Sequence, residues 1–105
     1  MWTIEEALPL IRELDVIAQH HGFTVAFYGG VLTRGTGKDL DLFFIEQDQD
    51  ICSIEKCLQE IAAIPEVLRY GALVDHSNEI TCAIFMKNGE HIDAHFRGFG
   101  KPSHR

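Results

Sequence analysis

The chain has 105 residues, 46% of them hydrophobic, which is enough for the core of one domain but not of two. Its formal charge of −7 at pH 7 argues against an extensive nucleic-acid surface, because such a surface needs a basic stripe along the phosphates. The three cysteines lack CxxC spacing, which argues against a disulfide framework or a zinc knuckle. No apolar run is long enough to span a bilayer and no basic leader opens the chain, so we expect a cytoplasmic protein without membrane contact.

The N-terminal segment has the pattern of an amphipathic helix. Thr3 and Glu6 have the spacing of a capping box, which satisfies free backbone N–H groups at a helix start. Apolar residues then recur at helical intervals until Gly22, namely Ile4, Leu8, Ile11, Leu14 and Ile17. Pro9 lies inside this pattern and removes one backbone hydrogen bond, so a kink or a separate first turn is expected there.

Two strands follow this helix. Residues 24–28 are rich in β-formers, and residues 40–45 are apolar on both faces, as in a central strand. The connection at residues 31–38 has room for one helical turn and a glycine loop but not for a full crossover helix. We therefore expect the two strands to be close neighbours in one sheet.

The second half predicts a helix and a hairpin. Asp48 or Asp50 is expected to cap a helix whose apolar face is Ile51, Ile54, Leu58 and Ile61 and which ends before Pro65. Residues 67–74 form a weaker strand, and Asn88-Gly89 predicts a tight turn between strands at 80–87 and 90–96. With Lys87 opposite Glu90, Ile84 would lie opposite Asp93. Periodicity stops after Arg97, so we expect one domain at residues 1–97 and a flexible tail at 98–105.

Three aspartates lie in or next to apolar strands, where burying a charged side chain is energetically unfavourable. Asp39 and Asp41 are two apart at a strand start, so both leave the same face, and they precede an apolar run. A bare pair of this kind is more often a solvated strand end than a site. Asp93 adds a third acid within the hairpin, and Gly29-Gly30 ends the preceding strand, where backbone N–H groups can approach a phosphate. Together these elements predict a divalent-metal and nucleotide-phosphate site.

The order of these motifs resembles that of a known superfamily. Tyr28-Gly29-Gly30, eight further residues, Asp39-Leu40-Asp41-Leu42 and the later Asp93 resemble the DNA polymerase β-like nucleotidyltransferases, in particular their minimal stand-alone members. The similarity spans residues 23–96. It implies an α+β fold, with a mixed β-sheet of about five strands and two main helices packed on one face.

The resemblance also implies a reaction and its residues. Asp39 and Asp41 would hold Mg²⁺ (or Mn²⁺), and Asp93 would be the third acid that activates an acceptor hydroxyl for attack on the α-phosphate of a nucleoside triphosphate. Gly29 and Gly30 would hold the outer phosphates, and the further donors would be Thr33, Arg34 and Lys38. Many relatives carry serine where this chain has Gly30 and Lys38.

The partners and two other functions stay open at this point. The acceptor would be a small molecule, an RNA end or a protein, and a second copy of the chain or a helical partner protein would complete the pocket. The first alternative is a catalytically weak or inactive antitoxin or regulatory subunit with the same fold. The second is a metal-dependent hydrolase that uses His91, Asp93 and His95, which alternate on one strand and offer ligands for Zn²⁺, Mn²⁺ or Fe²⁺. A protein that only pairs with another chain through its sheet is less compatible with three retained acids.

Overall fold

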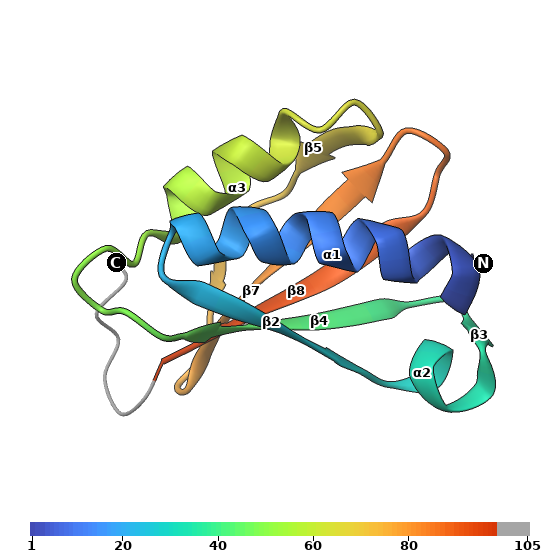
Figure 1. Cartoon of the computed structure of the whole chain (residues 1–105), viewed down its shortest axis with the longest axis horizontal. Coiled ribbons are helices and arrows are strands. Elements are labelled where there is room, and N and C mark those ends of the chain that lie inside the picture. Colours follow the sequence, from blue (N-terminus) through green and yellow to red (C-terminus); the bar gives the residue numbers. More distant parts are fainter. Residues whose placement is uncertain (99–105) are drawn as a thin grey trace.

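The structure, a computed structural model, describes residues 1–98 and is drawn in Figure 1. Its elements in chain order are β1 (Trp2–Thr3), α1 (Ile4–His20), β2 (Phe23–Tyr28), α2 (Gly30–Arg34), β3 (Thr36–Gly37), β4 (Leu40–Glu46), α3 (Ile54–Ala62), β5 (Val67–Tyr70), β6 (Val74–Asp75), β7 (Glu79–Met86) and β8 (His91–Arg97).

One mixed sheet organises these elements. Its strand order is β2-β4-β8-β7-β5, and the short β6 also pairs with β7, which makes six strands. The β4–β8 pair is parallel and the other pairs are antiparallel. α1 and α3 lie side by side on one face of the sheet (Figure 1). The predicted α+β class, the mixed sheet and the two main helices on one face are thus confirmed.

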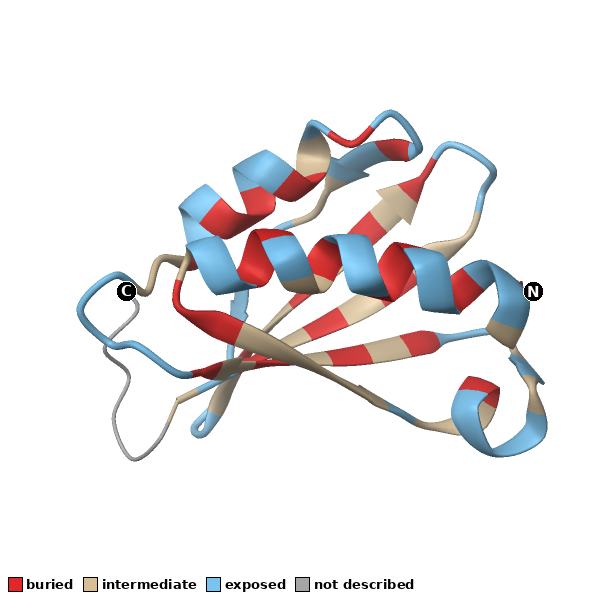
Figure 2. Cartoon of the chain, viewed as in Figure 1, coloured by how far each residue is buried: buried red, intermediate tan, exposed pale blue. Residues whose placement is uncertain are grey.

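The core lies between this helical pair and the sheet. In β4, β7 and β8 every second residue is buried, and the helices turn their buried residues toward those strands (Figure 2). Phe44 and Phe96 stack with their ring centroids 4.6 Å apart, and Phe23 meets Phe96 edge-on at 5.2 Å. Aromatic pairs of this kind add to the stabilisation from burial alone. The opposite face of the sheet is not covered by α1 or α3 and is called the open face below.

α1 begins with the predicted capping box. The Thr3 hydroxyl accepts from the Glu6 N–H at 3.2 Å, and the Glu6 carboxylate accepts from the Thr3 N–H at 3.1 Å. The helix is continuous through Pro9, so the expected separate first turn is wrong. Leu8 is exposed, and the buried face is instead Ala7, Leu10, Ile11, Leu14, Ile17 and Ala18.

The start of α3 also differs from expectation. Its N-cap is Ser53, whose hydroxyl accepts from the Lys56 N–H at 3.3 Å, not Asp48 or Asp50. The physical reason is that the N–H groups of Gln47 and Asp48 both donate to the Gly22 carbonyl oxygen, which fixes this stretch as a turn. Ile51, expected on the helical face, is exposed before the helix begins.

The β7–β8 hairpin shows a register one residue away from the prediction. Ile84 pairs with Ile92 and Ala83 with Asp93, so Asp93 does not lie opposite Ile84. The loop closes between Met86 and Glu90, and the Gly89 N–H donates to the Met86 oxygen with Gly89 at a φ of 92°. A three-residue loop with glycine in the left-handed region replaces the expected two-residue turn, and one extra residue shifts every pair.

The described part of the structure ends one residue beyond β8. From residue 99 onward the predicted tail at 98–105 lies outside the described residues, and the boundary at residue 97 stays a prediction. Within residues 1–98, no helix has the length and apolar character that crossing a bilayer requires.

Candidate metal and nucleotide site

Two of the predicted acids face each other across neighbouring strands. Asp41 of β4 and Asp93 of β8 are Cα partners in the parallel pair, and both lie on the open face, since their neighbours Leu40, Leu42 and Ile92 are fully buried. Neighbouring strands lie roughly 4.8 Å apart, so the two carboxylates leave the sheet side by side. The structure therefore brings together two acids that are far apart in the sequence.

Asp39 is linked to Asp93 through His91. It lies in the connection between β3 and β4 and is exposed. The His91 Nε2 atom is 3.6 Å from Asp39 Oδ1 and 3.5 Å from Asp93 Oδ1. One donor atom from each of Asp39, His91 and Asp93 lies within 4.8 Å of the other two, which is a spacing that one cation can bridge.

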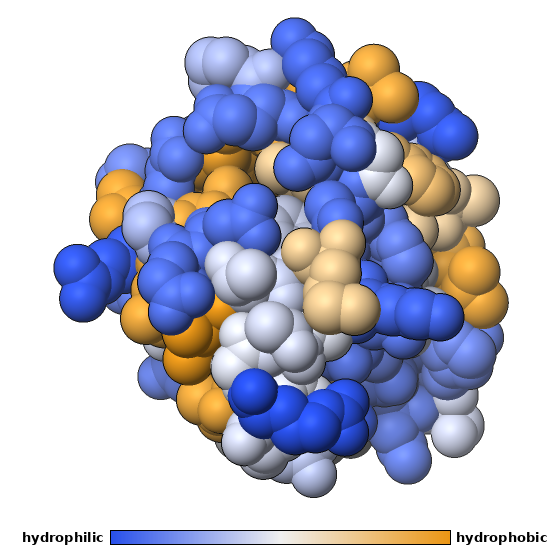
Figure 3. All heavy atoms as spheres, turned by 90° about the vertical axis from the view of Figure 1, so that its right-hand side faces the viewer, coloured by the Kyte–Doolittle hydropathy of each residue, from blue (hydrophilic) through white to orange (hydrophobic). Residues whose placement is uncertain are grey.

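The Gly29-Gly30 turn lies at the side of Asp41. Gly29 has a φ of 106°, which L side chains rarely adopt, and a Cβ on it would lie 3.4 Å from Asp41 Oδ2. A Cβ on Gly30 would collide with the guanidinium of Arg34, so that cation covers the place where a side chain at this position would lie. The face around α2 is mostly hydrophilic, with a paler strip of intermediate hydropathy down its middle (Figure 3).

The remaining predicted donors are placed less directly. The Thr33 hydroxyl donates to the carbonyl oxygens of Gly29 at 3.3 Å and Gly30 at 3.4 Å, so it supports the turn from within. Lys38 is exposed next to Asp39 in the same connection. Of the five predicted phosphate-binding residues, Gly29, Gly30 and Arg34 form one surface, Thr33 braces it, and Lys38 flanks the acids.

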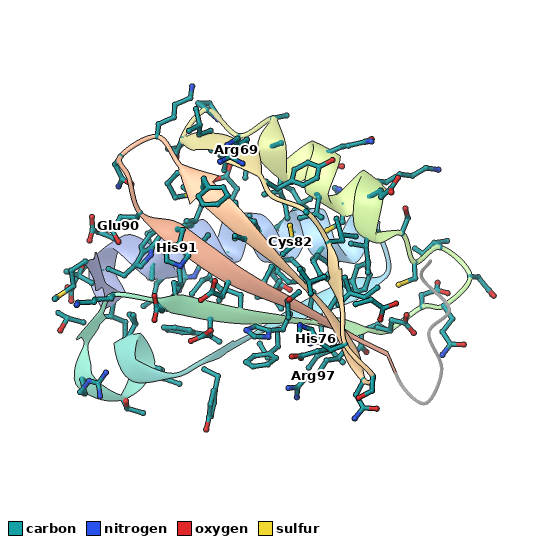
Figure 4. The ribbon with its side chains drawn as sticks, turned by 180° about the vertical axis from the view of Figure 1, so that it is seen from behind. Arg69, His76, Cys82, Glu90, His91 and Arg97 are labelled. Carbon is teal, nitrogen blue, oxygen red and sulfur yellow. The ribbon has the colours of Figure 1, made fainter. Side chains whose placement is uncertain are left out.

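His95 continues the polar row along the open face of the sheet. Its Nε2 lies 3.3 Å from Asp41 Oδ1 and its Nδ1 lies 3.2 Å from Glu79 Oε1, while its ring stacks on Phe43 at 4.5 Å. Arg97 Nε donates to Glu79 Oε2 at 2.8 Å. Partial burial acts to raise the pKa of Glu79, but the hydrogen bonds from Arg97 and His95 outweigh it and leave that pKa lowered. Figure 4 looks onto this face, with His91 and Arg97 near opposite ends of β8.

Asp93 is the acid whose ionisation the site disfavours. Partial burial raises its pKa, and the nearby carboxylates of Asp41 and Asp39 add to that rise, although His91 opposes them. The main cause is the burial of the Asp93 carboxyl, and the like charge of the two neighbouring carboxylates adds to it. A cation placed among the three acids would relieve it.

Comparison with known proteins gives structural matches only. No protein-family profile and no curated protein sequence matches the chain. A cytoplasmic RNA terminal U-transferase superposes with a TM-score of 0.60 and 14% identity, covering 88% of this chain and 28% of the other. The Thermotoga maritima CCA-adding enzyme complexed with tRNA gives 0.55 and 24% over 87% of this chain and 21% of that one. A CCA-adding enzyme with CTP gives 0.57 and 23% over 87% and 20%.

The chain has the nucleotidyltransferase fold. All three solved structures are polymerase β-like nucleotidyltransferases, as the resemblance in sequence indicated. The chain spans 20–28% of the length of these proteins, so their RNA and nucleotide ligands belong to them and not, by this likeness, to the present chain.

Within this nucleotidyltransferase fold, the structure does not support the alternative metal site formed by His91, Asp93 and His95. His95 faces Asp41 and Glu79, and in residues 1–98 the group of candidate ligands within 4.8 Å comprises Asp39, His91 and Asp93 without it. The sequence reading did not single out Glu79. The feature that could have identified Glu79 is its pairing with Arg97 across the hairpin, and this pairing follows only from the correct register.

Proposed function

We propose that this chain transfers a nucleoside monophosphate from a nucleoside triphosphate to a hydroxyl acceptor, with Mg²⁺ or Mn²⁺ as cofactor. The observation that carries the proposal is the pairing of Asp41 with Asp93 on adjacent strands, with the Gly29 turn against Asp41. The nucleotidyltransferase fold of the chain supports it. The reaction residues in this proposal are Asp39, Asp41 and Asp93.

The donor set around Asp39 and Asp93 fits a divalent cation. Two carboxylates and the imidazole of His91 offer atoms within 4.8 Å of one another, and Asp41 stands next to Asp93. Carboxylates suit Mg²⁺ and Mn²⁺, and an imidazole among them favours Mn²⁺. When bound, the metal would neutralise phosphate charge and orient the entering and leaving oxygens.

The chain's own groups divide the remaining tasks. The Gly29-Gly30 turn offers backbone that a phosphate can approach closely, and Arg34 above it brings a planar pair of donors suited to phosphate oxygens. The acceptor's hydroxyl oxygen forms a bond to the α-phosphorus, and the bond from that phosphorus to the oxygen of pyrophosphate breaks. Asp93, whose pKa is raised, would take the hydroxyl proton.

Calorimetry with ATP, GTP, CTP and UTP in Mn²⁺ or Mg²⁺ tests the nucleotide site. We expect Asp41→Asn to weaken metal-dependent binding at least about tenfold, which is roughly 1.4 kcal/mol. Asp50→Asn is the matched control, because it removes the same charge from an exposed turn remote from the acids and should change affinity by less than about twofold. Equal metal-dependent affinity of the wild type and Asp41→Asn for the triphosphates would contradict the proposal.

A turnover assay distinguishes between the two proposed functions, an active enzyme and a regulatory subunit. An active enzyme releases pyrophosphate and transfers the α-phosphate label of the triphosphate to an acceptor. Nucleotide binding without pyrophosphate release, whichever acceptor is offered, would favour the antitoxin or regulatory subunit. The structure also fits that function, because an imidazole nitrogen lies within 3.6 Å of a carboxylate oxygen of each of the three acids. A second copy of the chain or a helical partner protein belongs to either version of the proposal, and sedimentation velocity with and without nucleotide tests for self-association.

A further inference from the structure

A cavity lies on the open face, on the far side of Asp93 from the glycine turn. The edge strand is interrupted between Tyr70 and Val74, and a cavity of about 430 Å³ sits at the interruption. Gly71 is held there by its N–H, which donates to the Ala83 oxygen at 2.8 Å. In Figure 4, Arg69 and His76 mark the two ends of this β5–β6 edge.

The glycine turn, the acids and the cavity stand in one row across the sheet. Gly29 adjoins Asp41, Asp41 pairs with Asp93, and Asp93 pairs with Ala83, which lines the cavity. In an in-line displacement the attacking oxygen approaches the phosphorus from the side opposite the leaving group. If pyrophosphate leaves toward Gly29-Gly30, the acceptor must approach from the side of the cavity.

The lining of this cavity is mainly apolar. Its walls include the side chains of Ala72, Val74, Ala83 and Phe85. Among residues 1–98, no lysine or arginine lines it, and Arg69 stacks on the Phe85 ring at 4.2 Å instead. A nucleic-acid end brings a negative charge with each nucleotide and needs cations to hold it. Next to the Asp93 carboxylate, on a chain of net charge −7, this lining disfavours such an acceptor.

The polar side chains of the cavity lining include those of Thr81, Asp93 and His95. The Thr81 hydroxyl is engaged with His76 at 3.1 Å, and the two ring nitrogens of His95 face Asp41 and Glu79. That leaves the Asp93 carboxylate as the group placed to accept a proton from a ligand hydroxyl. A volume of this size is in the range of pockets for small organic ligands.

We propose that this cavity is the acceptor subsite, and that it takes an uncharged hydroxyl compound with an apolar body. The inference rests on the proposed nucleotidyl transfer. The hydroxyl oxygen of the compound bonds to the α-phosphorus, its proton passes to Asp93, and pyrophosphate leaves with the electron pair of the broken bond. The product is a phosphodiester between the compound and the nucleoside.

Binding to the cavity can be measured without any turnover. Benzyl alcohol is the apolar probe, and the trinucleotide UpUpU, with its free 3′-hydroxyl, is the nucleic-acid probe. In ¹H–¹⁵N spectra of the full chain, we expect benzyl alcohol to shift the amide signals of Ala72, Val74 and Ala83, and UpUpU to leave them in place. The reverse pattern, or no shift with benzyl alcohol, overturns the subsite.

Transfer is then measured with the α-labelled triphosphate that binds most tightly. Ala83→Leu fills the cavity floor and should reduce labelling of benzyl alcohol at least about tenfold, with metal-dependent triphosphate binding within about twofold of the wild type. Ala26→Leu, the same change on the open face of β2 and outside the lining, is the control, and melting curves check that both variants fold. Ala72→Trp fills the cavity from the loop if Ala83→Leu does not fold.

The outcomes separate the two proposals. Metal-dependent triphosphate binding, together with labelling of UpUpU that Ala83→Leu leaves unchanged, overturns the acceptor assignment and leaves the nucleotide site standing. Triphosphate binding that does not depend on Asp41 would contradict the nucleotide site, and it would overturn both the proposed function and the acceptor subsite.

Discussion

His91 lies where a cation or its substitute would sit. Its Nε2 is nearly equidistant from Asp39 at 3.6 Å and Asp93 at 3.5 Å, so the ring either ligates a metal with them or occupies the space between the two carboxylates in place of a metal. We expect His91→Ala to weaken Mn²⁺ binding on the order of tenfold, as loss of one donor from such a set does. Isothermal titration with MnCl₂ measures it.

The control for this change is His20→Ala, because His20 is exposed at the end of α1 and carries the same side chain away from the acids. It should leave the Mn²⁺ affinity as it is. Tighter binding by His91→Ala would mean that the imidazole competes with the metal instead of ligating it.

At the level of single residues, the sequence predicted much of this cluster but not its neighbours. The period of two in a strand is enough to relate Asp39 to Asp41, because both residues belong to one local pattern. The meeting of Asp41 with Asp93 depends on the parallel β4–β8 pair, which no local pattern encodes. The proximity of His91 to Asp39 depends on that same pair, so its place beside a metal could be raised only as an alternative.

The β7–β8 hairpin depends on the backbone of Gly89. Its φ is 92°, and a Cβ there would meet nothing within 4 Å, so an alanine would be penalised by conformation and not by collision. We expect Gly89→Ala to lower the free energy of unfolding by about 1 kcal/mol. Gly89→Asn should cost less, since asparagine tolerates the left-handed region. Urea denaturation measures both, and an equal loss for the two variants would contradict the explanation.

The Gly89 loop marks the limit of what the sequence predicted about β7 and β8: which residues share a face was predicted correctly, but the pairing between the strands was not. Alternation within β8 identified which of its residues share a face, and the structure keeps His91, Asp93 and His95 together on the open face. Pairing across the hairpin depends on loop length, and a loop of three residues gives a different partner to every position. The elements themselves were predictable because capping and periodicity are local, as at Thr3 and Glu6 of α1.

The whole molecule divides its tasks between the two faces of one sheet. The face under α1 and α3 holds the stacked phenylalanines and the buried aliphatic residues. The open face gathers the carboxylates of Asp39, Asp41 and Asp93. Like charges held side by side at a partly buried position oppose folding, and natural sites often retain such groups at the expense of stability.

This division predicts that removing one acid stabilises the metal-free protein. Burial and the neighbouring Asp41 and Asp39 raise the pKa of Asp93, so its ionised form disfavours the folded state at pH values above that pKa. Asp93→Asn removes the charge and should raise Tm by roughly 1–2 °C at pH 7, a small figure because the side chain is 39% exposed and partly screened. The gain should shrink as the pH falls through the raised pKa, where the wild-type carboxyl becomes protonated.

With Mn²⁺ present, we expect the wild type to have a higher Tm than Asp93→Asn. A cation that binds the folded chain raises Tm in proportion to the logarithm of its concentration over Kd, and the wild type has the fuller donor set. Melting curves at pH 5 and pH 7, with and without MnCl₂, give the four comparisons needed. If Asp93→Asn melts below the wild type without metal at pH 7, the carboxylate stabilises the fold, and the open face is then an ordinary polar surface instead of one kept for a cation.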